Sequence, residues 1–192
     1  MQTVVLNTVS KHLTNIERID GIDVPSKWST KTSVNAAGKL YVQDLQQGTG
    51  EVPLEKYHIV TLWEAIEHIE NVYIFLSNIR KVLAPDGVIL LSTPNLLSLS
   101  RFIKGKRWVG ILEEDHKYLF DALSLSMVLS RAGFYKIKVH GYYFPSLGEA
   151  LDWTNKSLAL IPGGGMLFAV AFKNIIVPDN LPRPGLTMIN YL

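Results

Sequence analysis

Polar side chains stand where several of the expected strands end. Asp23 and Asp44 each close a short apolar stretch, and polar groups in residues 61–64 and 93–95 follow two further stretches. In an open α/β sheet, ligands bind at the carboxyl ends of the strands. A carboxylate there can accept hydrogen bonds from both hydroxyls of a ribose, and one after the next strand can accept from an adenine amino group. The alternative is that these acids cap helices or close turns.

The strands that must carry these side chains are predicted from β-rich or apolar runs. Residues 88–92 are apolar without alternation, which is typical of a strand buried on both faces. From residue 173 onward, Pro178, Pro182 and Pro184 predict an irregular extended tail. The predicted strands are residues 18–24, 39–45, 57–62, 88–92, 134–140 and 166–172.

Apolar residues at helical spacing predict the helices between those strands. Residues 4–13 predict a short amphipathic helix, with a strand at residues 3–6 as the alternative. A later helix is capped by Asp121 and ends before Gly133. Between them lies a helix that the proline of residues 85–87 ends. The apolar face of that helix consists of Ile69, Val72, Leu76, Ile79 and Leu83.

The alternation of strands and helices predicts an α/β fold with an open, mostly parallel sheet and helices on both faces. The last two strands, joined by residues 141–165, are expected to form an antiparallel edge hairpin. We expect residues 1–172 to form this domain and residues 173–192 to form the tail. A basic and aromatic stretch at residues 101–108 is expected to be a solvated loop over the active site.

Composition excludes several classes of protein. Hydrophobic residues make up 47% and charged residues 19%, so disordered and collagen-like chains are excluded. The sequence has no cysteine, which excludes disulfides, thiol catalysis and thiolate metal sites, and fits the cytoplasm. Basic and acidic residues are nearly balanced, 19 against 17, which gives a net charge of +2. This balance argues against nucleic acid as the main partner. Since a membrane span needs about 20 apolar residues, we expect none, and we expect no secretory signal.

Five short motifs follow one another along the chain. They are residues 61–68 (TLWEAIEH), 79–87 (IRKVLAPDG), 91–95 (LSTPN), 116–120 (HKYLF) and 131–134 (RAGF). In this order and spacing they resemble the class I S-adenosylmethionine-dependent methyltransferases, in the groups called methyltransferase types 11, 12 and 23. The earlier strands ending at Asp23 and Asp44 resemble the second and third strands of that family.

The resemblance implies a Rossmann-like methyltransferase fold with S-adenosylmethionine as cofactor. It further implies methyl transfer to an oxygen or nitrogen of a small molecule or saccharide. Asp23 would hold the ribose hydroxyls of the cofactor. Asp44 would hold the adenine amino group, with Leu45 providing backbone and an apolar wall. The floor under the adenosine and methionine portions would be lined by Leu62, Trp63 and Glu64.

The resemblance also places two histidines near the acceptor pocket. His68 and His116 are then candidate catalytic residues, because an imidazole with a pKa near 6.5 suits removal of a proton from a hydroxyl or amine. The alternative is that both histidines orient loops through hydrogen bonds. We expect no metal site.

One departure from the family concerns the glycine-rich loop after its first strand. That loop lies roughly twenty residues before the acidic residue of the second strand, and here Asp23 is the twenty-third residue. We therefore expect an N-terminally truncated sheet without that strand and loop. The gap would be filled by an intermolecular partner, by direct pairing of residues 18–24 with 57–62, or partly by residues 3–6. An exposed edge would also allow a homo-oligomer. The alternative function is a non-catalytic or fragmentary protein that acts through association.

Overall fold

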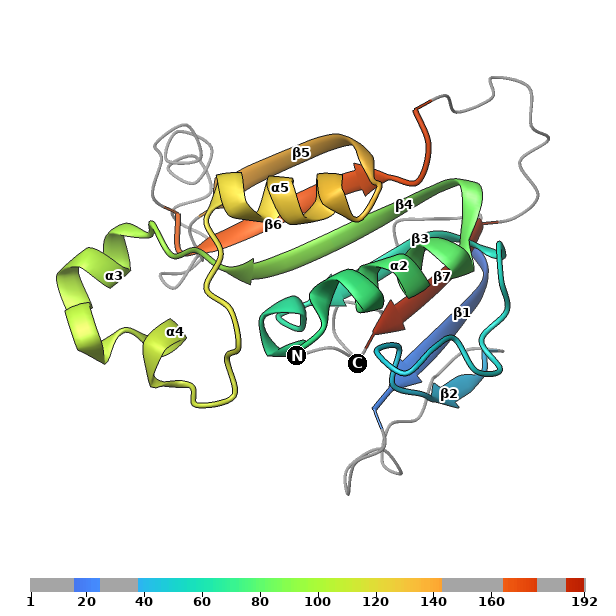
Figure 1. The fold of residues 1–192 in the computed structure, drawn as a ribbon, viewed down its shortest axis with the longest axis horizontal. Coiled ribbons are helices and arrows are strands. Elements are labelled where there is room, and N and C mark those ends of the chain that lie inside the picture. The colour runs from blue at the N-terminus through green and yellow to red at the C-terminus, as the bar shows by residue number, and fades with distance from the viewer. Residues whose placement is uncertain (1–15, 25–37, 143–163, 176–185, 192) are drawn as a thin grey trace.

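The computed structural model describes residues 16–24, 38–142, 164–175 and 186–191, and shows a seven-stranded sheet in the order β2-β1-β7-β3-β4-β6-β5 (Figure 1). The strands from β2 to β4 run parallel, whereas β6 is antiparallel to both β4 and β5. The expected antiparallel edge is therefore confirmed. The strands are β1 (Ile16–Asp23), β2 (Leu40–Val42), β3 (Tyr57–Trp63), β4 (Leu83–Pro94), β5 (Tyr135–Tyr142), β6 (Met166–Phe172) and β7 (Leu186–Tyr191).

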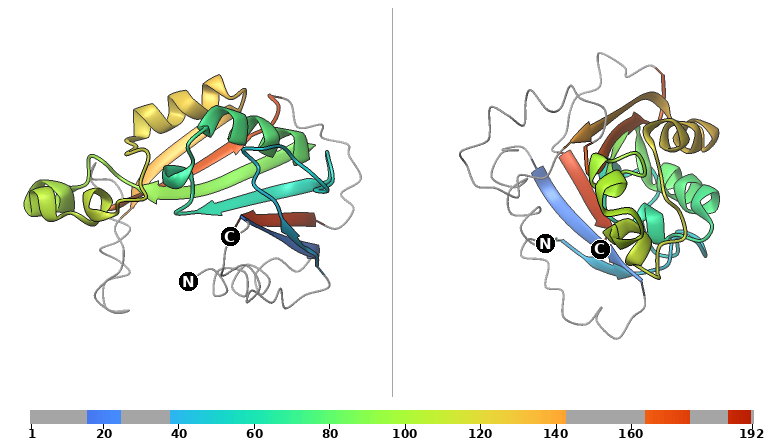
Figure 2. Two further views of the ribbon diagram at one scale, coloured as in Figure 1. Left: turned by 60° about the horizontal axis from the view of Figure 1, so that its bottom comes forward. Right: turned by 90° about the vertical axis from the view of Figure 1, so that its left-hand side faces the viewer.

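The two longest helices in the described ranges lie on the same face of the sheet (Figure 2). These are α2 and α5, and the prediction of helices on both faces is not met within those ranges. Of residues 101–108, expected to form a loop, residues 101–107 instead belong to short helices beyond the end of the sheet (Figure 1). The helices are α2 (Val72–Val82), α3 (Leu99–Lys104), α4 (Val109–Leu112) and α5 (Ala122–Arg131), with 3₁₀ turns η2 (Ile66–His68) and η3 (Gly105–Arg107).

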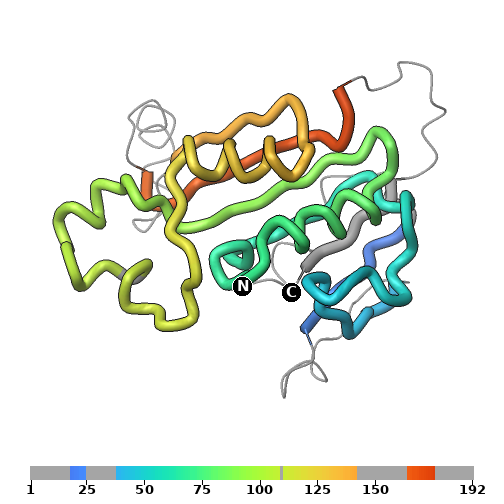
Figure 3. Tube along the Cα trace, viewed as in Figure 1, coloured from blue at the N-terminus to red at the C-terminus, as the bar shows by residue number. Residues whose placement is uncertain are grey.

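Helix α2 packs its apolar stripe onto the sheet and then turns directly into β4 (Figure 3). Leu76 and Ile79 of the predicted face are buried, but Ile69 precedes the helix and Leu83 is already extended. Residues 85–87 lie inside β4, where its register with β3 shifts, so they do not form a separate turn. The helix still ends before Pro85, since proline cannot continue it.

Helix α5 begins and ends where the sequence predicts. The Asp121 carboxylate accepts a hydrogen bond from the Ser124 N–H at 2.7 Å, and the Ser124 hydroxyl accepts from the Asp121 N–H at 2.9 Å. This reciprocal pair satisfies two amides at the start of the helix. After the helix, Gly133 has φ 86°, a left-handed conformation that glycine adopts without strain.

Strand β7 overturns two expectations. It lies between β1 and β3 and pairs parallel with both, so the tail expected to be irregular contains a central strand of the sheet. The gap expected between these strands is filled by the chain itself, neither by a partner nor by direct pairing of β1 with β3. The open edge that suggested a homo-oligomer is thereby closed at this position.

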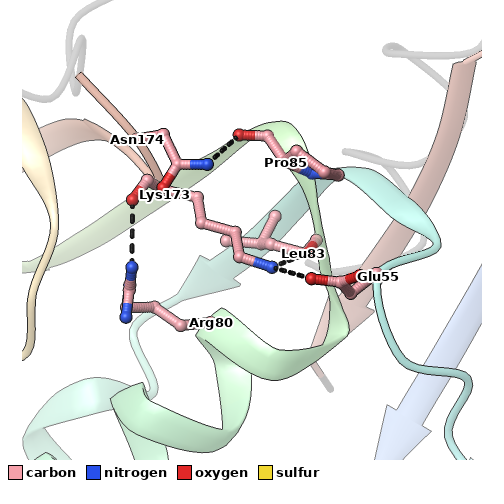
Figure 4. Close-up of polar contacts among 6 residues, drawn as sticks. All are labelled: Glu55, Arg80, Leu83, Pro85, Lys173 and Asn174. Atoms are coloured by element: carbon pink, nitrogen blue, oxygen red, sulfur yellow. Dashed lines mark hydrogen bonds and ion pairs between the residues drawn. The ribbon is translucent and has the colours of Figure 1, made fainter. Parts of the chain in front are cut away.

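The end of β6 is fixed to the edge of the sheet where β3 and β4 begin (Figure 4). The Lys173 ammonium donates to the Leu83 carbonyl at 2.7 Å and contacts the Glu55 carboxylate at 3.1 Å. The Lys173 carbonyl accepts from Arg80 at 3.2 Å, and Asn174 donates to the Pro85 carbonyl at 2.8 Å. These contacts hold residues 173–174 beside the start of β4, with Glu55 of the segment before β3.

The predicted helix at residues 4–13 and the alternative strand at residues 3–6 lie outside the described residues. Among the residues that are described, no helix is long and apolar enough to cross a membrane.

Candidate functional site

Asp23 and Asp44 lie at the same edge of the sheet, at the ends of neighbouring parallel strands. Asp23 is the last residue of β1 and pairs with Val42 of β2, two residues before Asp44. The Asp23 carbonyl accepts a hydrogen bond from the Gln43 N–H at 2.9 Å, which keeps the two strand ends together. Two carboxylates are therefore placed at one rim, at the carboxyl ends of the strands where ligands bind in open α/β sheets.

The two carboxylates differ in their partners. Asp44 Oδ1 accepts from the Gln46 N–H at 2.8 Å and closes a local turn, the role given to it by the alternative interpretation. Within the described ranges, no hydrogen bond or ion pair engages the half-buried Asp23 carboxylate. As far as the described residues are concerned, both Asp23 oxygens are therefore open to hydroxyl donors.

Leu45 and Leu62 have fully buried side chains in the hydrophobic core. The Leu45 carbonyl accepts a hydrogen bond from Asn78 Nδ2 at 2.7 Å, so this backbone group is already satisfied. Both residues support the rim from beneath. From the sequence, Leu45 was expected to form an apolar wall of the cofactor site and Leu62 part of its floor. In the structure, neither side chain lines an open surface.

Trp63 and Glu64 occupy the end of β3, between the acidic rim and the histidines. The Trp63 ring stacks on Phe168 at 5.8 Å between centroids, and its buried Nε1 has no partner among the described residues. Glu64 is exposed and has φ 50°. A non-glycine residue in this left-handed region stores about 1–3 kcal/mol of strain, which is most often found at functional sites.

A cleft of about 260 Å³ opens next to Glu64 at the ends of β3 and β4. Its volume is below the range of about 300–1,000 Å³ that encloses a drug-sized ligand. It can hold a reacting group with a short substituent and cannot enclose a whole nucleoside. The cleft is lined by Glu64, Glu67, His68, Pro94, Trp108, Gly110, Glu113, His116, Gly165 and Met166.

Glu67 is the most buried acid of the cleft, at 1% exposure. Its Oε2 accepts a hydrogen bond from the Thr93 hydroxyl at 2.9 Å, while its Oε1 has no partner among the described residues. Burial raises the pKa of Glu67, although the Thr93 hydrogen bond and the two neighbouring histidines act in the opposite direction. An unpartnered carboxylate oxygen therefore lies beside the cleft.

His68 and His116 lie side by side in the cleft, with ring centroids 4.8 Å apart. His116 Nδ1 lies 2.9 Å from the Gly110 carbonyl, and His68 Nδ1 lies 3.3 Å from the Asp115 carbonyl. A carbonyl can only accept, so Nδ1 carries the proton in each ring and Nε2 keeps its lone pair when the ring is neutral. These bonds orient the rings, as the alternative interpretation states, and they also leave two basic nitrogens.

Glu67, His68 and His116 each offer one ligand atom, and these atoms all lie within 4.8 Å of one another. Two imidazole nitrogens and one carboxylate are a common donor set for a divalent cation. A carbonyl bond at Nδ1 is the outer contact that usually accompanies a histidine ligating through Nε2. The cluster can therefore act on a proton directly or hold a cation, although no metal site was expected from the sequence.

Several residues that line the cleft were not selected from the sequence as site residues. Glu67 was part of a motif but was not selected, although its place beside His68 after a strand was a usable signal. Trp108 is buried at the cleft. Gly164 and Gly165 belong to a glycine run without a phosphate-loop pattern, and their carbonyls accept hydrogen bonds from Asn95 at 2.8 and 3.0 Å. Of the two, Gly165 lines the cleft.

A family model described as a methyltransferase domain matches residues 5–139. The chain belongs to the methyltransferase domain family. A methyltransferase domain of this kind uses S-adenosylmethionine, so the predicted enzyme class and cofactor are confirmed.

A curated relative and two solved structures resemble this methyltransferase. The relative, ubiquinone biosynthesis O-methyltransferase from Rickettsia conorii, is 33% identical over 82 residues, which are 42% of this chain and 28% of the relative. The chain thus matches under a third of the relative's length. A SAM-dependent methyltransferase from Archaeoglobus fulgidus has a TM-score of 0.59 at 14% identity, over 90% of this chain and 94% of that one.

The second structure is a SAM-dependent methyltransferase from Thermotoga maritima. It has a TM-score of 0.60 at 12% identity, and the match covers 81% of this chain and 82% of that one. At such identities the two structures support the Rossmann-like fold of this methyltransferase and carry no information about its acceptor.

Proposed function

We propose that this methyltransferase transfers a methyl group to an oxygen or nitrogen of a small molecule or saccharide. The cofactor would lie along the rim formed by β1, β2 and β3, and the acceptor would enter the cleft beside Glu64. The observation that carries the proposal is the pair of Nε2 lone pairs, held by carbonyl bonds at Nδ1, in a cleft at the carboxyl end of β3.

The cofactor part of the proposal is supported by the chemistry of the rim. Asp23, without a partner in the described ranges, would accept from the two ribose hydroxyls. Asp44 Oδ2 would accept a hydrogen bond from the adenine amino group, while Oδ1 keeps the hydrogen bond from the Gln46 N–H that closes the local turn. Glu64 lies next to the cleft and carries the charge that suits the cationic end of the cofactor. When bound, S-adenosylmethionine supplies an electrophilic methyl group on a sulfonium.

The residues of the cleft would control the proton that the acceptor must lose. His116 or His68 would take that proton on Nε2, so that the oxygen or nitrogen of the acceptor becomes the attacking group. Glu67 stabilises the resulting imidazolium, because its carboxylate lies within 4.8 Å of both rings. Trp108 and Met166 restrict the size of the substituent beside the reacting atom.

A second way to activate the acceptor follows from the same donor set. A divalent cation on Glu67, His68 and His116 would bind the acceptor oxygen and lower its pKa. The two versions differ in one observable: only the cation version loses activity to a chelator.

Isothermal titration with S-adenosylhomocysteine tests the cofactor part. Asp23→Ala is expected to weaken binding roughly tenfold to a hundredfold, since two hydrogen bonds to a charged group are lost. Asp86→Ala removes a carboxylate at the opposite edge of the sheet and serves as the matched control. Equal affinities for wild type and Asp23→Ala would remove Asp23 from the cofactor site.

A further inference from the structure

Strand β7 is what joins the two parts of the sheet. β1 and β2 lie on one side of it, and β3, β4, β6 and β5 lie on the other. In the register, Ile189 lies between Asp20 and Val60, and Tyr191 lies between Ile22 and Leu62. A short C-terminal segment therefore occupies a central position of a mostly parallel sheet.

The flanking strands require an occupant at this position. Ile22, Val60 and Leu62 are almost fully buried, as is Asp20. Without β7, the backbone N–H and C=O groups that face it would be left unpaired in the interior. Such groups are almost always paired in native proteins, so an empty space here has a strong tendency to bind an extended segment.

An independent contact fixes the width of this space. The Tyr57 hydroxyl donates to Asp20 Oδ2 at 2.7 Å, from β3 to β1, across the position of β7. Adjacent strands lie about 4.8 Å apart, so β1 and β3 are separated by about 9.6 Å, which is room for one strand. This contact involves no residue of β7, and both of its side chains are buried.

The contacts of Lys173 and Asn174 fix where the chain leaves β6, at the edge of the sheet where the parallel strands begin (Figure 4). They hold the chain beside the start of β4, two strands away from β7 in the sheet. Residues 175–185 can span up to roughly 40 Å, whereas three strand spacings from β6 to β7 amount to about 14 Å. The segment can therefore reach its position within the same molecule.

We propose that the space between β1 and β3 is a strand-binding site for a segment with the sequence of residues 186–191, offered by the same chain or by a second copy. Main-chain hydrogen bonds supply the binding and do not depend on which molecule provides the segment. A tethered segment has an effective concentration in the millimolar range, so occupation within one molecule dominates in dilute solution. Exchange between copies increases with protein concentration.

Occupation of this site also sets the distance between Asp23 on β1 and Glu64 after β3. If β7 left, β1 and β3 could approach to one strand spacing, and the rim would narrow by about 4.8 Å. The expected loss of cofactor affinity rests on the proposed function. The strand-binding site does not, so the two ideas can fail separately.

The first test uses the full-length Ile189→Pro variant, which loses a ladder N–H and cannot continue a central strand. We expect a lower Tm and at least tenfold less hydrogen-exchange protection at residues 19–22 and 59–62, equivalent to about 1.4 kcal/mol. Adding a synthetic peptide of residues 185–192 should restore both in a saturable manner. A peptide that carries Ile189→Pro should restore neither property. The control at the level of the protein is Ile175→Pro, which places a proline at an exposed residue before β7.

The second test leaves β7 free to form and instead links it to β3 by a disulfide. The sequence has no cysteine, so Thr61→Cys with Asn190→Cys introduces the only thiols. These positions are paired in register, at a spacing that a disulfide can bridge. We expect this pair to form a disulfide within one chain and also a disulfide-linked dimer, whose fraction rises with protein concentration. The control pair Val60→Cys with Asn190→Cys should form little of either disulfide. Equal yields from both pairs, or no restoration by the wild-type peptide, would overturn the proposal. If S-adenosylhomocysteine binding alone is unchanged by Ile189→Pro, only the link to the cofactor fails.

Discussion

The Tyr57 hydroxyl donates a 2.7 Å hydrogen bond to Asp20, linking β3 to β1 across strand β7. The other oxygen of Asp20 accepts from Arg18 Nε and from the Lys39 N–H, each at 2.7 Å. A buried charge is costly unless it is fully hydrogen-bonded. Asp20, with no exposed surface, meets this condition through three donors from three segments of the chain.

Removing the Tyr57 hydroxyl should destabilise the fold. Tyr57→Phe leaves Asp20 Oδ2 without its donor, at a cost of about 1–3 kcal/mol in the free energy of unfolding. Urea denaturation measures this cost. Tyr73→Phe, on the exposed side of α2, is the matched control and should be neutral. Equal stability of both variants would show that the Tyr57–Asp20 bond contributes nothing.

The same cluster predicts how stability depends on pH. Burial opposes the charge of Asp20, yet the hydrogen bonds from Lys39, Arg18 and Tyr57 outweigh it and hold the pKa of Asp20 below its ordinary value. A depressed folded-state pKa stabilises the fold above the unfolded value of about 3.9, and this stability is lost as the pH falls through the folded value.

The loss of stability caused by Asp20→Asn should therefore become smaller in acid. The difference in urea midpoint between wild type and Asp20→Asn is expected to be largest above about pH 5 and to shrink below about pH 4. Asp115→Asn, at an exposed acid, should follow the wild-type profile. A difference that stays constant from pH 7 to pH 3 would contradict the depressed pKa of Asp20.

Glu64 is expected to contribute to cofactor binding while its left-handed backbone lowers the stability of the fold. Glu64→Gly relieves the left-handed backbone and should raise the free energy of unfolding by up to about 1 kcal/mol, after the entropy cost of glycine. The same change should weaken S-adenosylhomocysteine binding, because the acid beside the cleft is lost. Lys136→Gly, at φ 47° on β5, is the control for strain alone and should leave affinity unchanged. Unchanged affinity in Glu64→Gly would place Glu64 outside the site.

The Glu67–His68–His116 cluster should bind a divalent cation if the cation version of the mechanism holds. Titration with Mn²⁺ or Zn²⁺ is expected to show one site, lost in His68→Gln and in His116→Gln. His140→Gln, at an exposed histidine of β5, should bind as wild type does. A wild-type protein that binds no cation, and keeps its activity in a chelator, would leave direct proton transfer to the histidines as the mechanism.

Much of the fold follows from local sequence signals. The limits of β6, the cap at Asp121 and the left-handed Gly133 were all predicted, because each depends on residues next to one another in the chain. β2 is shorter than predicted and β4 is longer. Strand ends depend on pairing with neighbours, which a single sequence does not reveal.

Strand β7 could not be predicted by the same means. Three prolines precede it, and its pairing partners lie more than 120 residues earlier in the chain. The demand for a strand at this position arises from the unpaired edges of β1 and β3, not from residues 186–191 themselves. At the site, local motifs found His68 and His116, whereas the inclusion of Glu67 depended on its burial and on its distance from His116.

The central claim is that the nucleoside of S-adenosylmethionine lies on the rim beside Asp23, with its reactive end facing the cleft. A crystal structure of the full chain with S-adenosylhomocysteine tests this most directly. We expect both ribose hydroxyls within hydrogen-bond distance of the Asp23 carboxylate and the sulfur next to Glu64, facing His68 and His116. A nucleoside bound away from β1, or a sulfur pointing away from the histidines, would contradict the account.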